Sequence, residues 1–353
     1  MLPSQNTVVF RADASAQIGG GHVVRCLALA HVLHARGWHC AFVGIKDVVQ
    51  TVPQILSAPV IFIELADPQD DTPEQLCKHW PEGISCLVVD HYGRDHSYES
   101  AWRPWANVIL AIDDLANRQH DCDLLLDQTY GRQTEDYSSL VPQHCQLLLG
   151  ADYALLREPF ARLRARSLQR RRVTSQIQRV LISFGAADTG DITTIALASI
   201  LAGDVSVAVD VVVGAQGENL DKFRQIALSH PGRVTIHRAI DAEQMAELMC
   251  DADLAVGACG TSSWERCVLG VPTLGIVTAD NQRMVAQRLA QCGAMVLLND
   301  FNAEFAALLT HEYGQLRNYP ARLVEMSRSA AQICFGNGAV LVARKIQLGC
   351  GGF

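Results

Sequence analysis

The stretch IGGGHVVRCLALA (residues 18–30) joins a predicted strand to a predicted helix. The strand is NTVVFRAD (residues 6–13), and the helix is expected from His22 to about Arg36, closed by Gly37. Glycines in such a loop permit positive φ and let a ligand approach the backbone, while the N–H groups at the helix start favour an anion. The glycine cluster by itself is equally typical of a tight turn that binds nothing.

Short β-rich runs alternate with helical patterns along the whole chain. The first half continues with the predicted strands HCAFVGI, PVIFIEL, ISCLVVD, NVILAIDD and CDLLLDQ. The second half repeats the alternation with RVLISFG, VAVDVVVG, RVTIHRAI, ADLAVGA, VPTLGIV and AMVLLND. Several runs are nearly all apolar, which is typical of parallel strands covered on both faces. The pattern predicts an α/β protein of two doubly wound, Rossmann-type domains facing a cleft.

The same alternation predicts the domain boundaries. We expect a first domain over residues 1–160, a linker over 161–178, a second domain over 179–335, and a C-terminal segment over 336–353 that is able to cross back to the first domain. Residues 160–178 read FARLRARSLQRRRVTSQIQ, rich in Arg and poor in large hydrophobic residues. This composition favours an exposed helix and linker over a nucleic-acid-binding patch.

Composition excludes several classes of protein. The 353 residues are 49% hydrophobic and 19% charged, which indicates a well-buried globular enzyme, and the net charge of −8 argues against a nucleic-acid partner or an acidic lipid surface. We expect no membrane partner and a cytoplasmic location, because neither a spanning segment nor a signal-peptide pattern is evident. The twelve cysteines form no CxxC pair and are expected to be reduced, buried thiols, so neither a metal nor a cofactor is predicted.

His22 gives the first loop a possible chemistry. It is expected at the carboxyl end of the sheet, where open α/β folds place their sites. An unperturbed histidine titrates near pH ~6.5, so it can accept a proton at neutral pH. Asp13 and Ser15 are close enough in sequence to orient the imidazole or a water. The spacing alone equally allows an inert residue beside the helix start.

A second motif, GACGTSSWERCVLGVPTLGIVTADNQ, covers residues 257–282. A predicted strand leads into a glycine turn and a helix capped by Thr261 or Ser262, whose N–H groups would cradle a diphosphate. Glu265 follows Thr261 by four residues on the same helix face, where it can accept hydrogen bonds from ribose hydroxyls. Trp264 is expected to pack in the core rather than stack on a base.

A third turn of this kind is SFGAADTGD (residues 183–191), which joins another predicted strand to a helix. Asp188 or Thr189 is expected to cap the helix. The turn would face the same cleft as the other two.

These motifs carry a family resemblance. RADAS followed by IG.GH..RCL.LA, combined with G..G.S.WE...LG.P.L.I..ADNQ, resembles the UDP-sugar hydrolases of pseudaminic acid biosynthesis, the PseG group. Spore-coat polysaccharide proteins of the SpsG type are close relatives, and the GT-B glycosyltransferase that makes lipid II is similar in turn. The resemblance runs from Arg11 to the terminal GNGA segment (residues 336–339) and implies a GT-B-like fold. One departure is GGGHVVRC, where a larger residue is expected before the final Gly-His.

The resemblance implies a reaction and a set of site residues. UDP-2,4-diacetamido-2,4,6-trideoxy-β-L-altropyranose would be the partner and substrate, hydrolysed to UDP and the free sugar. The sequence itself offers no metal-ligand cluster for attack at phosphorus, so we expect C–O cleavage with inversion. His22 would be the catalytic residue. The implied substrate-binding residues are Arg11, Asp13, Gly20, Gly21, Tyr92 and Asn281, and the implied UDP-binding residues are Gly185, Ile240, Gly260, Thr261, Ser262 and Glu265. No metal ligands are implied.

Two other functions fit the same motifs. A GT-B glycosyltransferase with a UDP-sugar donor would share the second domain, and turnover with water alone distinguishes the hydrolase from it. A non-catalytic nucleotide-sugar-binding subunit would bind UDP without hydrolysing any UDP-sugar. Protein partners and oligomeric state are not predicted by the sequence.

Overall fold

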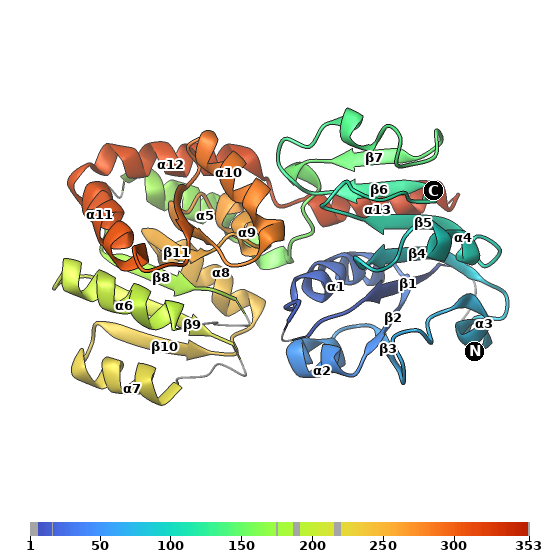
Figure 1. Cartoon of the computed structure of the whole chain (residues 1–353), viewed down its shortest axis with the longest axis horizontal. Coiled ribbons are helices and arrows are strands. Elements are labelled where there is room, and N and C mark those ends of the chain that lie inside the picture. The colour runs from blue at the N-terminus through green and yellow to red at the C-terminus, as the bar shows by residue number, and fades with distance from the viewer. Residues whose placement is uncertain (1–5, 16, 174–175, 186–190, 215–219, 352–353) are drawn as a thin grey trace. The chain divides into compact units, whose positions relative to one another are not determined.

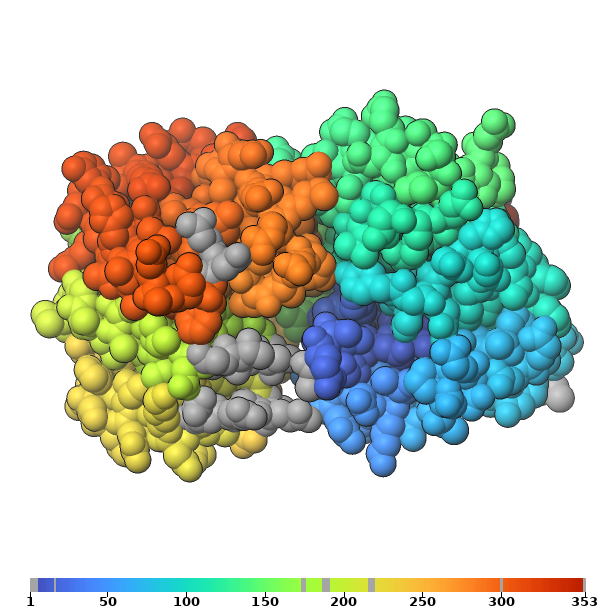
Figure 2. Space-filling view, viewed as in Figure 1, coloured from blue at the N-terminus to red at the C-terminus, as the bar shows by residue number. Residues whose placement is uncertain are grey.

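The computed structural model describes residues 6–15, 17–173, 176–185, 191–214 and 220–351. The chain divides into two compact units (Figure 1). Unit 1 comprises Met1–Leu156 and Asn337–Phe353, and unit 2 comprises Arg157–Gly336. The space-filling view shows that side chains fill the gaps left between the ribbons inside each unit (Figure 2).

The described residues of unit 1 form a seven-stranded parallel sheet in the order β3-β2-β1-β4-β5-β6-β7. The strand order reverses between β1 and β4, which makes a topological switch point at their carboxyl ends. The strands are β1 (Thr7–Ala12), β2 (His39–Ile45), β3 (Ile61–Leu65), β4 (Ile84–Asp90), β5 (Ala106–Ile112), β6 (Leu124–Asp127) and β7 (Gln146–Leu149). The helices are α1 (Gly21–His34), α2 (Asp47–Thr51), α3 (Pro73–Leu76), α4 (His96–Trp102) and α13 (Gly338–Gly349), with short 3₁₀ helices η1 (Pro53–Leu56), η2 (Cys77–His79), η3 (Thr134–Tyr137) and η4 (Ala151–Tyr153).

Unit 2 repeats this architecture with a six-stranded parallel sheet in the order β10-β9-β8-β11-β12-β13 within the described part of the chain. The strands are β8 (Arg179–Ser183), β9 (Ala208–Val213), β10 (Val234–Arg238), β11 (Leu254–Ala258), β12 (Thr273–Val277) and β13 (Val296–Asp300). The helices are α5 (Glu158–Val173), α6 (Ile192–Gly203), α7 (Leu220–Ser229), α8 (Ala242–Asp251), α9 (Ser262–Val268), α10 (Arg283–Gln291), α11 (Phe305–Asn318) and α12 (Pro320–Ile333), with the 3₁₀ helix η5 (Asp280–Gln282).

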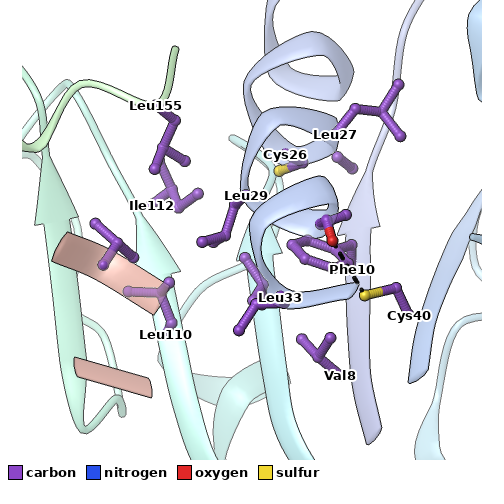
Figure 3. Close-up of a cluster of buried hydrophobic side chains, with 14 of the residues drawn as sticks. Val8, Phe10, Cys26, Leu27, Leu29, Leu33, Cys40, Leu110, Ile112 and Leu155 are labelled. Carbon is purple, nitrogen blue, oxygen red and sulfur yellow. Dashed lines mark hydrogen bonds between the residues drawn. The ribbon is translucent and has the colours of Figure 1, made fainter. Parts of the chain in front are cut away.

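Alternate residues of β1 enter different hydrophobic cores. Val8 and Phe10 belong to the core shared with α1, where Leu29 and Leu33 are fully buried (Figure 3). Val9 belongs to a second core on the other face of the sheet. Both faces are therefore covered, which explains the nearly continuous apolar strands. The predicted doubly wound α/β architecture is confirmed.

The strand prediction missed β7. Its four residues, QLLL, pair only with β6 at one edge of the sheet. A run this short, preceded by the polar stretch PQHC, resembles a loop when periodicity alone is considered.

The C-terminal residues from Asn337 belong to unit 1. Helix α13 packs against α1 and η4, and its residues Val342 and Ile346 are fully buried in the core that contains α1. Figure 1 shows this red helix among the blue and green elements of unit 1. A side chain at Gly338 would overlap the backbone of Tyr153 and Ala154, so a glycine is required where α13 begins.

The arginine-rich segment was expected to be an exposed helix and linker, but the structure packs it into unit 2. It contains helix α5, which packs against α8, α9 and α12 of unit 2. The Arg171 guanidinium is buried and donates hydrogen bonds to the carbonyls of Met249 and Ala252 at the end of α8, at 2.8 and 2.7 Å, and of Leu269 at the end of α9, at 3.0 Å. Carbonyls at helix ends have no intrahelical partner and favour a cation. Arg171 therefore caps two helices.

A buried ionic cluster joins His120 to Glu99 of α4 and to Asp113, the residue directly after β5. His120 Nδ1 is 2.8 Å from Glu99 Oε1, and His120 Nε2 is 3.8 Å from Asp113 Oδ2. Burial opposes a charge on this imidazole, but the Asp113 and Glu99 carboxylates outweigh it and raise the pKa of His120 to about 9. Asp113 accepts the N–H groups of Leu115 and Ala116 and so fixes the turn after β5.

We expect Arg171→Ala to lower the free energy of unfolding by about 3 kcal/mol, because it removes three hydrogen bonds from a buried guanidinium to carbonyls at helix ends. Urea denaturation followed by circular dichroism measures the change. The matched control is Arg172→Ala, since Arg172 is exposed on the same helix and should change stability by no more than about 0.5 kcal/mol. Equal effects of the two substitutions would contradict the capping role.

His120 should make stability fall at alkaline pH. Its pKa is raised on folding, so the stabilisation is complete below the unfolded value of about 6.5 and is lost as pH rises through about 9. Between pH ~7 and ~10 the wild-type protein should lose about 2–3 kcal/mol more than His120→Gln in urea titrations. Parallel pH dependences of the two proteins would show that His120 is not charged in the folded state.

Candidate functional site

A cluster of charged side chains lies at the switch point between β1 and β4. His22 and Arg25, one turn apart in α1, both reach Asp90, the last residue of β4. His22 Nδ1 and Arg25 Nη2 each lie 2.6 Å from Asp90 Oδ1, and Arg25 Nε lies 2.6 Å from Oδ2. The Cys26 thiol donates to Oδ2 at 3.5 Å. Asp90 was not among the predicted site residues, although its place at the end of the run LVVD is a signal that sequence reasoning had available.

The proton positions follow from this geometry. Burial alone would raise the pKa of Asp90, but Arg25 and His22 outweigh it and hold that pKa well below its usual range. The carboxylate therefore only accepts hydrogen bonds. Its contact with His22 Nδ1, at 2.6 Å, is shorter than the 3.1 Å between Arg25 Nη2 and the same nitrogen, so we assign the proton of a neutral His22 to Nδ1. Among the described residues none hydrogen-bonds Nε2, so this nitrogen keeps a lone pair that can accept a proton.

Tyr92 lies against the imidazole. The two rings are 4.8 Å apart and nearly perpendicular, at 89°. The Tyr92 hydroxyl donates to Asp114 Oδ1 at 2.9 Å, and Arg25 Nη1 donates to Asp114 Oδ2 at 3.3 Å. Arg25 thus links Asp90 to Asp114, and the predicted residues His22 and Tyr92 come together in one network.

Arg11 and Asp13 form a separate ionic group. The Arg11 side chain is 0% exposed, with Nη1 2.7 Å from Asp13 Oδ1 and Nε 2.6 Å from Asp71 Oδ2. His91 Nε2 donates to Asp13 Oδ2 at 3.1 Å, while its Nδ1 accepts the Gly93 N–H. The idea that Asp13 orients His22 is therefore wrong in this structure: Asp90 contacts the imidazole instead. Arg11 is too deeply buried to reach a ligand and acts on the neighbouring acids.

The backbone conformation and the packing of the loop before α1 explain two of its glycines. Gly19 has φ of +74°, and a side chain at Gly20 would approach Val52 Cγ2 to 2.8 Å. The Ser15 hydroxyl accepts the N–H groups of residues 17 and 18 rather than meeting the imidazole. Gly21 is the first residue of α1. Contact of Gly20 and Gly21 with substrate stays a prediction.

The residues predicted to bind UDP gather at the carboxyl edge of the sheet in unit 2. Each follows the end of a strand: Gly185 after β8, Ile240 after β10, Gly260, Thr261 and Ser262 after β11. Asn281 is exposed in η5, after β12. The expected caps Asp188 and Thr189 lie outside the described residues. The described residues that were predicted to bind UDP, together with Asn281, therefore lie at one edge of the same sheet.

The turn into α9 differs in detail from the expected hydroxyl cap. Thr261 occupies the N-cap position, but its side chain makes no capping hydrogen bond. The buried Arg266 holds the turn instead, because its Nη2 donates to the Ala258 carbonyl at 2.6 Å and its Nη1 to Ser262 Oγ at 3.2 Å. Trp264 is 3% exposed, which confirms that it packs in the core.

Glu265 has an arginine partner that sequence reasoning missed. Arg157 Nη2 donates to Glu265 Oε1 at 2.6 Å. The Glu265 side chain is 8% exposed and that of Arg157 is 30% exposed. The carboxylate is therefore held in a fixed direction at the edge of unit 2.

A pocket of about 340 Å³ opens at the same edge of unit 2. It lies between the end of β12 and the start of α6, and its polar lining includes Thr278, Asp280 and Arg283. Over the described residues, no group of three or more His, Cys, Asp or Glu side chains is placed to hold a metal ion. No helix in the described part of the chain has the length and apolar character needed to cross a membrane.

Sequence comparison relates the chain to a UDP-sugar hydrolase. No protein-family model matches. The UDP-2,4-diacetamido-2,4,6-trideoxy-β-L-altropyranose hydrolase of Campylobacter jejuni is 28% identical over 289 residues, which are 81% of this chain and 97% of that protein. An uncharacterised protein of Methanocaldococcus jannaschii is 23% identical over 275 residues, which are 77% of this chain and 55% of that protein.

Solved structures of the same fold cover nearly the whole chain. MurG of Acinetobacter baumannii aligns with a TM-score of 0.62 at 15% identity, over 97% of this chain and 99% of its own. The UDP-GlcNAc 2-epimerase of Neisseria meningitidis, bound to UDP-GlcNAc, aligns with a TM-score of 0.64 at 12% identity, over 97% and 100%. The rhamnosyltransferase SpnG complexed with thymidine diphosphate gives 0.56 at 15%, over the same shares. The chain therefore has a GT-B fold, and its resemblance to the PseG-type hydrolases, drawn from its motifs, is confirmed.

Proposed function

We propose that this protein hydrolyses UDP-2,4-diacetamido-2,4,6-trideoxy-β-L-altropyranose to UDP and the free sugar. The observation that carries the proposal is the His22–Asp90 pair, whose 2.6 Å contact fixes the tautomer that presents Nε2. The similarity to the Campylobacter hydrolase supports a nucleotide-sugar substrate. The neighbours that bind UDP-GlcNAc and thymidine diphosphate support nucleotide binding on this fold.

His22 acts as the general base. Its Nε2 takes a proton from water as the water oxygen bonds to the anomeric carbon, and the bond between that carbon and the diphosphate oxygen breaks. The electron pair leaves with UDP, so no protein acid is required for the leaving group. The imidazolium that forms faces the Asp90 carboxylate, which stabilises it as the aspartate of a catalytic triad does. A single displacement inverts the anomeric centre.

Attack at carbon is favoured over attack at phosphorus. Displacement at the β-phosphorus calls for a metal ion or an arginine clamp on the phosphoryl group. Near His22, the Arg25 guanidinium is already bound to Asp90 and Asp114. Attack at carbon needs a placed water, a base and a good leaving group, and His22 supplies the base.

The other site residues bind the two halves of the substrate. Tyr92, held beside His22 by Asp114, contacts the sugar, and Asn281 is assigned to the sugar from unit 2. Asp13 is assigned to substrate binding through its contact with His91. Arg11 holds the Asp13 carboxylate in place through their ion pair. The carboxyl edge of unit 2 binds UDP through Glu265 and through the positions after β8, β10 and β11.

His22→Asn should lower the hydrolysis rate by about 10²–10⁴, the usual contribution of a general base, and leave UDP affinity near the wild-type value. Steady-state kinetics and calorimetry measure the two effects. The matched control is His34→Asn, an exposed histidine on the same helix, which should retain full activity.

Hydrolysis in ¹⁸O-labelled water decides which bond breaks. The label should appear in the free sugar, and activity should survive a chelator. Label in UDP would overturn attack at carbon, whereas label in the sugar with an unchanged His22→Asn rate would remove His22 as the base. Turnover that requires an added acceptor would indicate a glycosyltransferase instead.

Glu265→Ala should weaken UDP binding roughly tenfold or more, because it removes charge-assisted hydrogen bonds to the ribose hydroxyls. Calorimetry measures the affinity. Glu243→Ala, in an exposed ion pair on α8, is the control and should bind UDP as the wild type does. Unchanged affinity of Glu265→Ala would show that this carboxylate does not bind the ribose.

A further inference from the structure

Three arginines at seven-residue intervals lie on one side of the α5 segment. Arg164 and Arg171 are two helical turns apart, so their side chains point the same way, and Arg157 immediately precedes the first residue of α5. All three contact α9, the helix that carries Glu265: Arg157 Nη2 reaches Glu265 Oε1 at 2.6 Å, Arg164 Nη1 the Val268 carbonyl at 2.5 Å, and Arg171 Nε the Leu269 carbonyl at 3.0 Å. We name this set the α9-facing stripe. The stripe contacts both ends of α9, because Glu265 lies in its first turn and the two carbonyls lie at its last turn.

A second set of arginines on the same helix faces α8. Arg162 pairs with Glu243, Arg166 with Glu247 at 2.6 Å, and Arg170 with Asp253 at 2.6 Å. Arg162 and Arg166 are about half exposed, so their ion pairs contribute little to stability. This second set provides a matched control in Arg162, which has the same residue type on the same helix and, in the described part of the chain, pairs with Glu158 and Glu243.

The contact between Arg157 and Glu265 differs from the other two because it fixes a side chain. A nearly buried carboxylate without a partner is costly, and the guanidinium offsets that cost. Arg157 uses one carboxylate oxygen, and no described residue hydrogen-bonds the other, Oε2. The Arg157 guanidinium is itself held over the Phe160 ring, 5.2 Å from its centre. The direction of Oε2 is therefore set before any ligand arrives.

We propose that Arg157 is a positioning residue for nucleotide recognition: it holds Glu265 so that the carboxylate accepts hydrogen bonds from both ribose hydroxyls. This inference rests on the proposed function, because it takes UDP as the ligand of unit 2. Arg157 acts through Glu265 and needs no contact with the nucleotide. Preorganising the carboxylate lowers the entropy lost on binding. Since the ribose does not react, the effect falls on binding and not on the chemical step.

The test compares UDP with 2′,3′-dideoxy-UDP, which lacks both ribose hydroxyls. In calorimetry the wild type should bind UDP at least about tenfold more tightly than the dideoxy compound. Arg157→Gln should lose most of this preference and bind the dideoxy compound as the wild type does. Arg157→Lys, which keeps a charge within reach of Glu265, should recover part of the preference. Arg162→Gln, from the second set, should retain all of it.

Kinetics and a double variant separate positioning from a general loss of structure. Arg157→Gln should raise KM for the UDP-sugar about tenfold and leave kcat within about twofold, as expected when uniform binding is lost. The double variant Arg157→Gln/Glu265→Ala should bind UDP no more weakly than Glu265→Ala alone, because both changes remove one interaction.

Four results would overturn the proposal. Full ribose preference in Arg157→Gln would show that Glu265 needs no positioning, while the UDP assignment would stand. Equal weakening of both ligands, or additive effects in the double variant, would show that Arg157 acts elsewhere than through Glu265. No preference for UDP in the wild type would remove the ribose contact and this inference with it, whereas hydrolysis dependent on His22 would remain.

Discussion

The Asp90 carboxylate accepts four hydrogen bonds at the carboxyl end of β4, two on each oxygen. All four donor atoms belong to three residues in the first two turns of α1, His22, Arg25 and Cys26, and a buried charge of this kind requires such partners. The first turn of α1 is therefore tied to the switch point of the sheet. The same carboxylate decides which nitrogen of His22 carries the proton. One constraint thus sets both the position and the tautomer of the imidazole.

In unit 2, arginines of α5 supply the hydrogen-bond partners that the ends of three helices lack. Helices α8, α9 and α12 end near α5, where their last carbonyls have no helical partner. Arg164 and Arg171 of α5 supply the missing donors and place positive charge at the negative ends of these helices. Burial lowers the pKa of Arg171 to about 10, so the guanidinium stays charged at neutral pH. The segment that links the two units in sequence therefore also fixes the helix assigned to nucleotide binding.

Periodicity predicted twelve of the described strands and placed His22 at the carboxyl edge of a sheet, because these features depend on residues close together in sequence. Asp90 escaped prediction as the partner of His22, since it lies 68 residues away and only the pairing of β1 with β4 brings the two together. The arginines of α5 were expected to be exposed for a similar reason. Composition indicates their charge, but the carbonyls that Arg171 binds lie 78, 81 and 98 residues away. Local pattern determines the elements, and long-range pairing determines the chemistry of the site.

His22 has the acid–base role because the neighbouring carboxylates, Asp13 and Asp90, and the second histidine, His91, are already bound to other groups. Burial would raise the pKa values of Asp13 and Asp90, yet their arginine and histidine partners hold both well below the usual range. Such carboxylates orient their neighbours at neutral pH but are poor bases. His91 uses one ring nitrogen to donate to Asp13 and the other to accept the Gly93 N–H. In this cluster, His22 Nε2 is the nitrogen that keeps a lone pair while its ring is held from the other side, and this is the arrangement that activation of a water requires.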